Sequence, residues 1–387
     1  MKAIVIGGGI GGITAAIALE RAGIEAHVFE RASVLSEVGA GISLWSNAID
    51  ALSVLGLGEA VRDCGWSEIH TDLRTWRGAV LSGSSAEQLA ADGIAVGLVH
   101  RADLLAMLVK QVDPARIHLG RECVAFDQDT NSVTAKFANG DTASGDLLIG
   151  ADGLRSVVRA QLFGGAPPRY AGYTGWRAVV RFTDSPLIPC ETWGCGRRFG
   201  VMPMRGGKVY WYATQNAPEG GRDASGEVKQ SLLRMFSGWH NSIEALIAAT
   251  EESAILRNDI YDREPLPRWT EKRAALLGDA AHPMTPNLGQ GACQAIEDAV
   301  VLAACLKASS GVVAALEEYE NRRRPRTDRI VLLSRRIGEV SQWGNPIACF
   351  ARNTMLRAMP ASAAARQMKS IVRYDALEGK RTRALGL

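Results

Sequence analysis

The 387-residue sequence predicts an α/β fold in which a parallel-sheet domain is interrupted by an inserted antiparallel β-sheet domain and followed by a helical C-terminal region. Three observations support this prediction. A strand, a glycine-rich turn, a helix and a second strand follow one another at the N-terminus. Residues 170–214 alternate in polarity and are rich in aromatic side chains, and the chain beyond Gly291 is prone to form helices. The length also favours two packed domains over one core.

The N-terminal unit begins with residues 3–6, an apolar run typical of a strand buried on both faces of a parallel sheet. We expect a helix over residues 13–22 and a second short strand over residues 26–29. This order of elements is a βαβ unit, in which the turn after the first strand is a common place to bind phosphate groups.

The turn carries the pattern G-x-G-x-x-G at Gly7, Gly9 and Gly12. Gly7 allows a tight turn, Gly9 lets a pyrophosphate approach the backbone, and Gly12 lets the helix pack closely against the strand. The phosphates then lie at the positive end of the helix dipole. A glycine-rich turn alone is a weak signal, but its position after a strand and before a helix predicts a Rossmann-like dinucleotide-binding domain.

The acid Glu30 ends the second strand, where a carboxylate can hydrogen-bond the ribose hydroxyls of an adenosine. It would repel a phosphate on that ribose, which favours FAD or NAD over NADP at this site. Arg31 follows and either modifies this preference or is a solvated surface charge.

Other segments complete the expected architecture. Helices are predicted to begin near Leu44 and Ala102, and residues 122–149 form a meander of strands with an Asn-Gly turn at residues 139–140. The inserted sheet turns at residues 206–207. Further elements are expected as helices over residues 227–236 and 242–249, a strand over residues 274–277, and a helical C-terminal region with breaks at residues 309–311 and at Pro346.

The segment "LLGDAAHPMTPNLGQGACQAIEDAVVLA" places Asp279 at the end of an apolar strand and "GQGA" at the start of a helix. An acid at a strand end can accept hydrogen bonds from a polyol such as a ribityl chain. A glycine-lined helix N-terminus offers backbone N–H groups to an electron-rich ring edge. A helix cap would explain Asp279 alone, but the whole cluster favours a flavin.

Three signatures carry a family resemblance: the N-terminal glycine motif with Glu30, "GADGLRSVVR" at residues 150–159, and "GDAAHPMTPNLGQGACQAIEDA" at residues 278–299. With "EEYENRRRPR" at residues 317–326, they make the chain resemble the group A flavoprotein monooxygenases, the para-hydroxybenzoate hydroxylase-like enzymes. The sequence of these segments is similar to that of the urate and salicylate hydroxylase-type members of the family. The resemblance runs over nearly the whole chain.

The resemblance implies which residues bind the cofactor FAD. The pyrophosphate would face Gly9, Ile10, Gly11 and Gly12, and the adenosine would meet Glu30, Arg31 and the backbone of Val124. Arg101 would reach the phosphate–ribityl region, and Asp279 would hold the ribityl chain or the pyrophosphate. The isoalloxazine O2/N1 edge would meet Gly289, Gln290 and Gly291, and the implied set also includes Gly7 and Ser43. Asp152 belongs to a motif associated with FAD and NAD(P)H together, although it is also explained as part of a strand-to-helix turn.

The inserted sheet would form the roof of a substrate pocket. Alternation places Tyr210 and Tyr212 on one face and Trp211 on the other. The full set of pocket candidates is Arg198, Met202, Tyr210, Tyr212, Pro286 and Asn287, with Tyr173 and Trp176 as further candidates that ordinary sheet packing explains equally well. No catalytic residue is assigned, and His282 is not expected to be a catalytic base.

One position departs from the urate hydroxylase pattern, in which an acid follows "TP". This chain has Asn287 there, which weakens an assignment to urate.

The expected domains are discontinuous in sequence. Residues 1–70, 98–170 and 270–300 form the FAD-binding domain, residues 71–97 and 171–269 the substrate domain, and residues 301–387 the helical C-terminal region.

The resemblance implies an FAD-dependent monooxygenase that uses NADH or NADPH and O2. Oxygen would add to the reduced flavin at C4a, and the resulting hydroperoxide would hydroxylate or epoxidise a small, aromatic or heteroaromatic substrate. The alternatives are a flavin oxidase or reductase of the same fold without oxygen transfer, and a non-catalytic flavin-binding protein. The sequence does not distinguish NADH from NADPH as the electron donor, or a monomer from a homodimer as the oligomeric state.

The composition narrows the possible partners and compartment. The formal net charge of +3 gives no reason to expect nucleic acid as a partner. Seven scattered cysteines without a CxxC pair argue against a disulfide framework and a metal site, and favour a reducing cytoplasm. No run approaches the ~18 apolar residues of a transmembrane segment.

Overall fold

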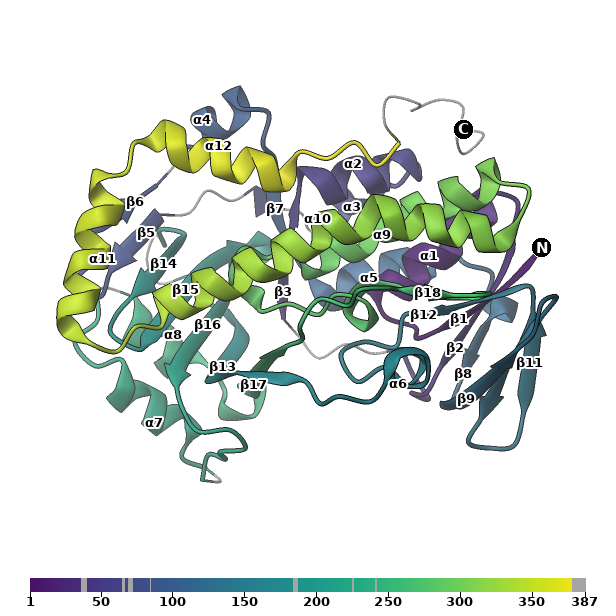
Figure 1. Ribbon diagram of the computed structural model, residues 1–387. Helices are drawn as coiled ribbons and strands as arrows, with labels where there is room; N and C mark the ends of the chain where they lie inside the picture. The colour runs from purple at the N-terminus through teal and green to yellow at the C-terminus, as the bar shows by residue number, and fades with distance from the viewer. Residues whose placement is uncertain are drawn as a thin grey trace.

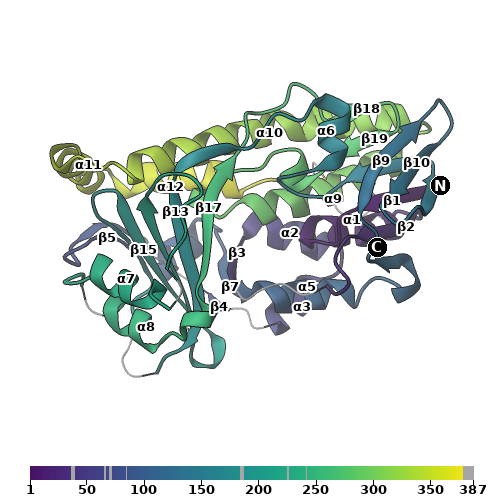
Figure 2. The same ribbon diagram turned by 90° about the horizontal axis from the view of Figure 1, so that it is seen from below.

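A computed structural model describes residues 1–35, 40–64, 67–68, 72–83, 85–183, 187–224, 226–240 and 242–377 of the chain. Two large sheets lie at opposite ends of the molecule, and the long helix α10 (Val312–Ser341) runs along both (Figure 1, Figure 2). The predicted α/β class with an inserted sheet and a helical C-terminal region is confirmed.

The first sheet has six strands and contains both N-terminal strands of the βαβ unit. All neighbours pair in parallel except the short edge strand β18, which is antiparallel to β19. The strand order is β18 (Thr270–Glu271), β19 (Ala274–Leu276), β12 (Leu147–Gly150), β1 (Lys2–Ile6), β2 (Glu25–Glu30) and β8 (Ile117–Leu119).

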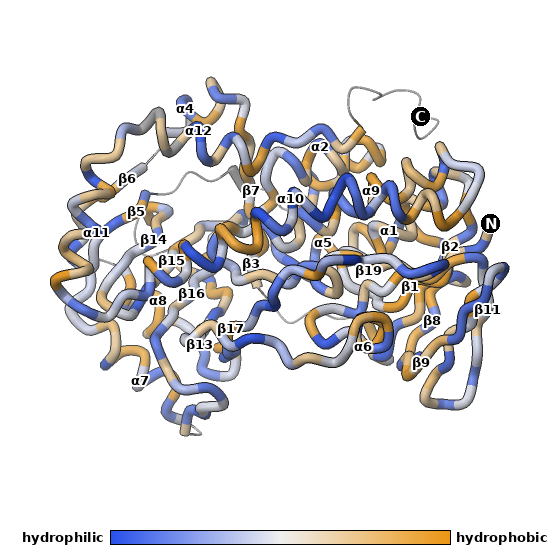
Figure 3. The backbone as a smooth tube through the Cα atoms, in the orientation of Figure 1, coloured by the Kyte–Doolittle hydropathy of each residue, from blue (hydrophilic) through white to orange (hydrophobic). Residues whose placement is uncertain are grey.

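Helices and a strand meander pack with this sheet in one core. Helix α1 (Ile10–Arg21) is enclosed by β1, β2 and α9 (Gly291–Ala308), and its apolar residues are fully buried. The meander contributes Phe126 and Phe137 to the same core. In Figure 3 the tube is largely hydrophobic along β1 and α1, whereas α10 carries long hydrophilic stretches. The meander strands are β9 (Cys123–Gln128), β10 (Val133–Phe137) and β11 (Thr142–Gly145).

The remaining elements of this half are short. A three-stranded sheet lies beside the core, in the order β3, β7, β4. The bounds are β3 (Gly41–Trp45), β4 (Ser67–Glu68), β7 (Val96–His100), α2 (Ser46–Val54), α3 (Gly58–Asp63), α5 (Arg101–Val109) and α6 (Val157–Phe163).

The second sheet has seven strands. Its neighbours are antiparallel except β5 and β14, which pair in parallel because β5 reaches the sheet from a distant part of the chain. The strand order is β17 (Leu256–Asp262), β13 (Arg169–Arg181), β16 (Lys208–Asn216), β15 (Arg197–Met204), β14 (Cys190–Trp193), β5 (Asp72–Thr75) and β6 (Val80–Ser82).

One face of the second sheet is covered by helices α7 (Val228–Met235) and α8 (Ile243–Ala249). Trp211 is fully buried on that face, stacked on Phe199 with ring centroids 5.4 Å apart. Because successive side chains of a strand point to opposite faces, Tyr210 and Tyr212 lie on the other face. The predicted alternation of these three residues is confirmed.

The C-terminal region returns over the second sheet. After α10, helix α11 (Pro346–Ala358) packs beside β6, and α12 (Ala361–Val372) runs past the short helix α4 (Ala86–Ala91) (Figure 1). Asn345 caps α11 through its side chain, which accepts hydrogen bonds from the backbone N–H groups of Ile347 and Ala348.

One predicted boundary, at the glycine turn, is wrong. Helix α1 begins at Ile10 rather than at residue 13, because the carbonyl of Gly9 already accepts the N–H of Ile13 at 3.0 Å. Tertiary packing here outweighs the poor helix propensity of Gly11 and Gly12. Leu44 belongs to strand β3, and helix α2 begins two residues later, at Ser46.

Candidate active site

A cavity of about 850 Å³ runs between the two halves of the molecule. It begins at Gly9, at the N-terminus of α1, and passes Asp279 and Gly289. It then reaches Tyr210 and Tyr212 on the open face of the second sheet. Its volume lies in the range of sites that bind small molecules and cofactors. The first and second sheets therefore contribute to one continuous site.

The glycine turn has the geometry that its pattern predicts. Gly7 has φ +111°, and a Cβ there would lie 2.3 Å from the carbonyl oxygen of Ala151. A Cβ on Gly12 would lie 1.9 Å from the carbonyl oxygen of Gly7. A Cβ on Gly9, by contrast, would meet no atom within 4 Å. Gly7 and Gly12 are thus required by the protein's own packing, whereas the space beside Gly9 is open to the cavity.

Glu30 fastens this turn from the end of β2. One carboxylate oxygen accepts the backbone N–H of Gly8 at 2.7 Å and the other accepts that of Ala32 at 2.8 Å. Both bonds orient the carboxylate at the end of the strand, next to the glycine turn.

Asp279 and Gly289 lie where the strand β19 and the helix α9 approach the cavity. The Asp279 carboxylate is exposed to the cavity, and among the described residues no donor hydrogen-bonds it. Desolvation by the surrounding protein atoms raises the pKa of this carboxylate, although the nearby His282 and Arg101 act to lower it. Gly289 has φ +60°, and a Cβ there would lie 2.6 Å from Oγ of Ser43. Only glycine fits this position without strain.

Two buried donors at this end of the cavity have no partner within the described part of the chain: Nε1 of Trp45 and Nε2 of Gln290. Buried polar groups are ordinarily hydrogen-bonded, so an unpaired donor in a cavity wall indicates a missing acceptor. The electron-rich carbonyl edge of a flavin is such an acceptor. The open space at Gly9, the unsatisfied Asp279 and these two donors together fit FAD.

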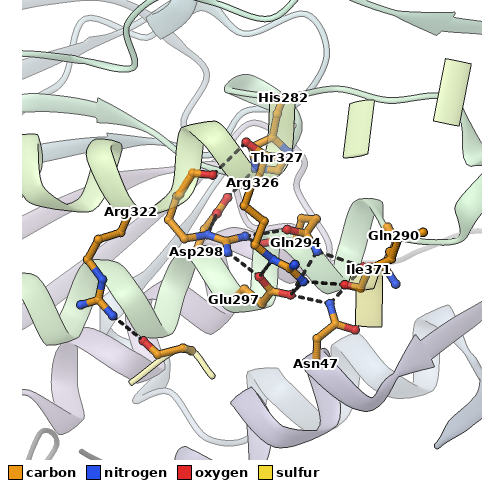
Figure 4. Close-up of polar contacts among 12 residues, drawn as sticks. Asn47, His282, Gln290, Gln294, Glu297, Asp298, Arg322, Arg326, Thr327 and Ile371 are labelled. Atoms are coloured by element: carbon orange, nitrogen blue, oxygen red, sulfur yellow. Dashed lines mark hydrogen bonds and ion pairs between the residues drawn. The ribbon is translucent and has the colours of Figure 1, made fainter. Parts of the chain in front are cut away.

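A buried ionic network lies behind Gln290 and ties α9 to α10 and α12 (Figure 4). Arg323 binds Glu297 through Nη1 and Asp298 through Nε at 2.7 Å, and Arg326 binds Glu297 at 2.9 Å. Arg326 also donates to the carbonyl oxygen of Ile371 at 2.7 Å. Two cations and two anions balance one another, so the network holds the helices without leaving a net charge beside the cavity.

Asn47 extends the network to the cavity wall. Its Nδ2 donates to Oε1 of Gln290 at 3.0 Å and to Oε1 of Glu297. Gln290 also accepts a bond from Gln294 at 2.9 Å. These contacts fix the orientation of the Gln290 amide, which leaves Nε2 as its unpaired donor.

The second sheet forms the opposite wall. The Tyr210 ring lies so close to Gly41 that a Cβ there would be 2.6 Å from the ring. Tyr212 lies equally close to Gly200, where a Cβ would be 2.1 Å from its Cε1 atom. Burial raises the pKa of both hydroxyls, which are therefore protonated donors at neutral pH. Met202 completes this part of the wall.

Arg198 reaches the same wall but is 3 % exposed and already paired. Its Nη1 lies 3.1 Å from Oε1 of Glu191, and its Nε donates to Oε1 of Gln342 at 3.1 Å. Burial disfavours the charge of Arg198, but the carboxylate of Glu191 outweighs it and raises the pKa of the guanidinium. Arg198 therefore contributes an ion pair to the wall rather than an isolated positive charge.

Asn287 is held between the sheet and α10. Its Nδ2 donates to Oγ1 of Thr285 at 2.8 Å and to the carbonyl oxygen of Ser334 at 2.9 Å, and its Oδ1 accepts from Tyr173 at 3.2 Å. A Cβ on Gly338 would lie 2.4 Å from Nδ2. The glycine in α10 makes this close approach possible.

Most predicted site residues line the cavity. All six pocket candidates do so, as do Trp176 and nine of the predicted cofactor residues, namely Gly9, Ile10, Gly11, Ser43, Arg101, Asp279, Gly289, Gln290 and Gly291. The other predicted cofactor residues, Gly7, Gly12, Glu30, Arg31, Val124 and Asp152, lie outside its described wall. Arg31 and Val124 are exposed on the surface near the end of β2 and in β9.

Three predicted residues have structural partners. Asp152 caps α6, because its carboxylate accepts bonds from Oγ of Ser156 and from the backbone N–H of Val157 at 2.7 Å. His282 is 2 % exposed, and its Nε2 lies 2.6 Å from Oδ2 of Asp298. Tyr173 is buried and lies outside the described wall of the cavity, in line with the alternative of ordinary sheet packing. Its hydroxyl serves instead to hold Asn287.

Sequence reasoning missed two parts of the site. One is the ionic network, signalled by the adjacent acids Glu297 and Asp298 within an apolar helix and by the arginine run at residues 322–324. The other is the apolar end of the cavity, which is formed by Leu89 of α4 and by residues of α11 and α12. Nothing in a local pattern shows which distant helices close a cavity.

Among the residues described above, no group of three or more His, Cys, Asp or Glu side chains has a spacing suited to a metal ion. None of the described helices is both long and apolar enough to cross a membrane.

Comparisons with known proteins agree with this site. A family model described as "FAD binding domain" matches residues 1–334. Aurachin C monooxygenase/isomerase from Stigmatella aurantiaca is 45% identical over 362 residues, which cover 93% of this chain and 94% of that protein. An FAD-dependent urate hydroxylase from Klebsiella pneumoniae is 37% identical over 343 residues, which cover 87% of this chain and 89% of that protein.

The fold is also similar to a solved structure, that of Klebsiella pneumoniae HpxO complexed with FAD and uric acid. The TM-score is 0.90 at 34% sequence identity, with 96% of each chain covered. The family match spans most of the chain, and the two relatives are by name a monooxygenase and an FAD-dependent hydroxylase, which supports flavin monooxygenase function. The chain therefore belongs to the FAD-binding-domain family of flavoprotein monooxygenases.

Proposed function

We propose that this protein uses NADH or NADPH to reduce bound FAD and inserts one atom of O2 into an aromatic or heteroaromatic ring. The observation that supports it most strongly is the continuous cavity, which joins the glycine turn at Gly9 to the tyrosine wall at Tyr210. A cofactor lying along this path would present its reactive end to a ligand beneath the second sheet.

The chain's own groups would hold FAD along the cavity. The backbone N–H groups of Ile10 and Gly11 at the start of α1 suit the pyrophosphate, and the carboxylate of Asp279 suits the hydroxyls of the ribityl chain. Trp45 Nε1 and Gln290 Nε2 are donors for the carbonyl edge of the ring system. Once reduced, FAD supplies the oxygen-activating chemistry.

The residues at the adenosine end and around Asp152 have separate proposed roles. Glu30 would accept the ribose hydroxyls while it orients Gly8, and Arg31 and Val124 would border the adenine from the surface. Asp152 would act on the cofactor only through the turn that it caps.

The wall of the second sheet would bind and orient the substrate ring. Tyr210 and Tyr212 offer protonated hydroxyls and aromatic faces, and Met202 and Pro286 offer apolar contact. Asn287, fixed by three hydrogen bonds, cannot turn to act as an acid or base. The protein thus positions the ring and excludes water, which limits the loss of oxidising equivalents as peroxide.

We place the protein in a reducing cytoplasm as a monomer or homodimer. None of the seven cysteines forms a disulfide in the described residues, and only Cys195 is exposed. Such buried thiols suit a reducing compartment.

The test is the rate of NADH and NADPH oxidation by the FAD-loaded protein in the presence of phenols, small aromatic acids and N-heterocycles. We expect one class of ring to stimulate oxidation of one or both donors. A Tyr210→Phe variant should raise the KM of that ring without loss of FAD, whereas Tyr170→Phe, which changes a hydroxyl bonded to the carbonyl of Ala217 outside the cavity, should not. A colourless protein that fails to bind FAD would contradict the proposal.

A further inference from the structure

The cavity includes a region lined mainly by apolar side chains from helices α4, α11 and α12 and the residues that follow α4 and α11. We call this region the apolar arm and define it by six residues: Leu89, Ile94, Leu356, Met359, Met368 and Ile371. The arm is part of the same cavity as Gly289 and Tyr210. An aromatic ring alone, held at the tyrosines, would leave the arm without a ligand.

The apolar arm is built into the fold rather than formed by a loose surface. Ile94 and Ile371 are each 4 % exposed and belong to one packed cluster with Leu288, next to the start of α9. Partly buried Leu89 and Met368 pack against that cluster. The arm thus shares its packing with the segment that borders the expected flavin ring.

Two polar contacts hold helix α12 beside the apolar arm. Lys369 Nζ lies 3.3 Å from Oδ1 of Asp92, beyond the end of α4. Arg326 of the ionic network donates to the carbonyl oxygen of Ile371 at 2.7 Å. These contacts keep α12 in place over the cavity and make the arm a preformed binding surface.

Two charged groups at the ring end of the cavity are paired with neighbours, whereas Arg177 lines the same wall opposite Tyr212. Arg198 pairs with Glu191 at 3.1 Å. Asp72 likewise pairs with Arg74 at 2.7 Å. The charges at this end therefore do not select between a neutral and an anionic ring, whereas the apolar arm favours an apolar tail.

We propose that the substrate is an aromatic or heteroaromatic ring that carries an apolar tail, with the ring at Tyr210 and Tyr212 and the tail in the apolar arm. The inference rests on the proposed function, because it assumes that the ring binds beneath the second sheet. It adds that the apolar arm determines which ring-bearing molecules bind. Each methylene group of the tail that leaves water contributes favourably to the free energy of binding.

The experiment measures the dissociation constants of 4-n-alkylphenols, from ethyl to octyl, for the oxidised FAD-loaded protein through the perturbation of the flavin absorbance. Because burial of one methylene contributes about 0.8 kcal/mol, the dissociation constant should fall up to about fourfold for each added methylene until the arm is filled. Affinity independent of chain length would overturn the proposal.

Two variants in or directly after α11 distinguish binding in the apolar arm from non-specific hydrophobic binding. The double variant Leu356→Gln, Met359→Gln should abolish most of the dependence on chain length and leave the affinity for phenol unchanged. Met355→Gln alters an exposed methionine of the same helix that lies outside the cavity wall, and should keep the full dependence. Equal slopes in both variants would also overturn the proposal. Because binding is measured without NAD(P)H, failure of the catalytic proposal and failure of this one are distinguishable.

Discussion

The side-chain nitrogen of Asn287 lies 2.9 Å from the carbonyl oxygen of Ser334 and donates a hydrogen bond to it. The pair joins the segment before α9 to helix α10 at the edge of the cavity. It also explains why an amide suits this position, since the site contains acceptors at Ser334 and Thr285 that require a donor.

An Asn287→Asp variant should therefore be less stable. The aspartate would place an acceptor against the carbonyl of Ser334, and an unmade buried hydrogen bond costs about 1–3 kcal/mol. Urea denaturation at pH 7 measures the change in the free energy of unfolding. Asn216→Asp, in which the amide contacts Gln342 in a partly exposed setting, is the comparison. Equal stability of Asn287→Asp and wild type would contradict the account of this pair.

Gly9→Ala and Gly12→Ala should fail in different ways. The Cβ at residue 9 meets no protein atom, so this variant should fold normally but lose affinity for FAD at least about tenfold, which corresponds to about 1.4 kcal/mol. The Cβ at residue 12 would overlap the carbonyl oxygen of Gly7, so this variant should unfold at lower temperature. Thermal denaturation of the apoprotein and titration with FAD distinguish the two. Normal FAD affinity in Gly9→Ala would place the cofactor elsewhere.

Removal of Arg323 should be strongly destabilising. Its side chain is fully buried between Glu297 and Asp298, and loss of one partner from a buried ion pair typically costs about 3–5 kcal/mol. Arg324→Met is the matched control, because that neighbour is partly exposed and its i,i+4 pairs contribute at most about 1 kcal/mol. Chemical denaturation of Arg323→Met and Arg324→Met compares them. Similar losses in the two variants would show that the network is not a major source of stability.

The same network should make the free energy of unfolding sensitive to acid. Burial favours the neutral acid of Asp298, but His282 and Arg323 outweigh it and lower its pKa from 3.8 to about 2. A carboxyl whose pKa is lowered by folding stabilises the protein above its unfolded pKa, and this contribution disappears as the pH falls through the folded value. Asp298 should therefore contribute about 2 kcal/mol that is lost between about pH 4 and pH 2. Unfolding free energies across this range should fall less steeply for Asp298→Asn than for wild type, and parallel curves would refute the assignment.

The cysteines should differ in reactivity towards a thiol reagent at pH 8. Burial raises the pKa of Cys64, Cys123 and Cys349 to about 11 and that of Cys293 to about 12, so these groups carry little thiolate. Cys195 is the exposed one among the described residues. One thiol should therefore react rapidly in the native protein, and Cys195→Ser should remove that phase. Several rapid thiols would contradict the burial of the others.

Local patterns were enough to predict the glycine turn after the first strand. The spacing of Gly7, Gly9 and Gly12 predicted close approaches of the backbone, which the structure has at Gly7 and Gly12, and an open position at Gly9. Strand alternation likewise predicted the faces of Tyr210 and Trp211, because side-chain direction in a strand depends only on neighbouring residues.

The parts of the site that escaped prediction depend on contacts between distant segments. Tyr173 has the same aromatic character as Tyr210, yet one holds Asn287 and the other lines the cavity. Arg198 pairs with Glu191, and Met368 and Leu89 pack against the same cluster. Both arrangements depend on the relative positions of distant elements, which only the folded chain fixes. The start of α1 was misplaced for a similar reason, since packing overrides the propensity of glycine.

The most direct measurement of the central claim is the isotopic composition of the product formed by the FAD-loaded protein under ¹⁸O2, with NADH or NADPH as donor and a ring that stimulates donor oxidation. The account predicts one ¹⁸O atom in each product molecule and about one product molecule formed for each donor oxidised. An unlabelled ring, with every oxidised donor recovered as labelled hydrogen peroxide, would show a flavin oxidase and contradict the claim.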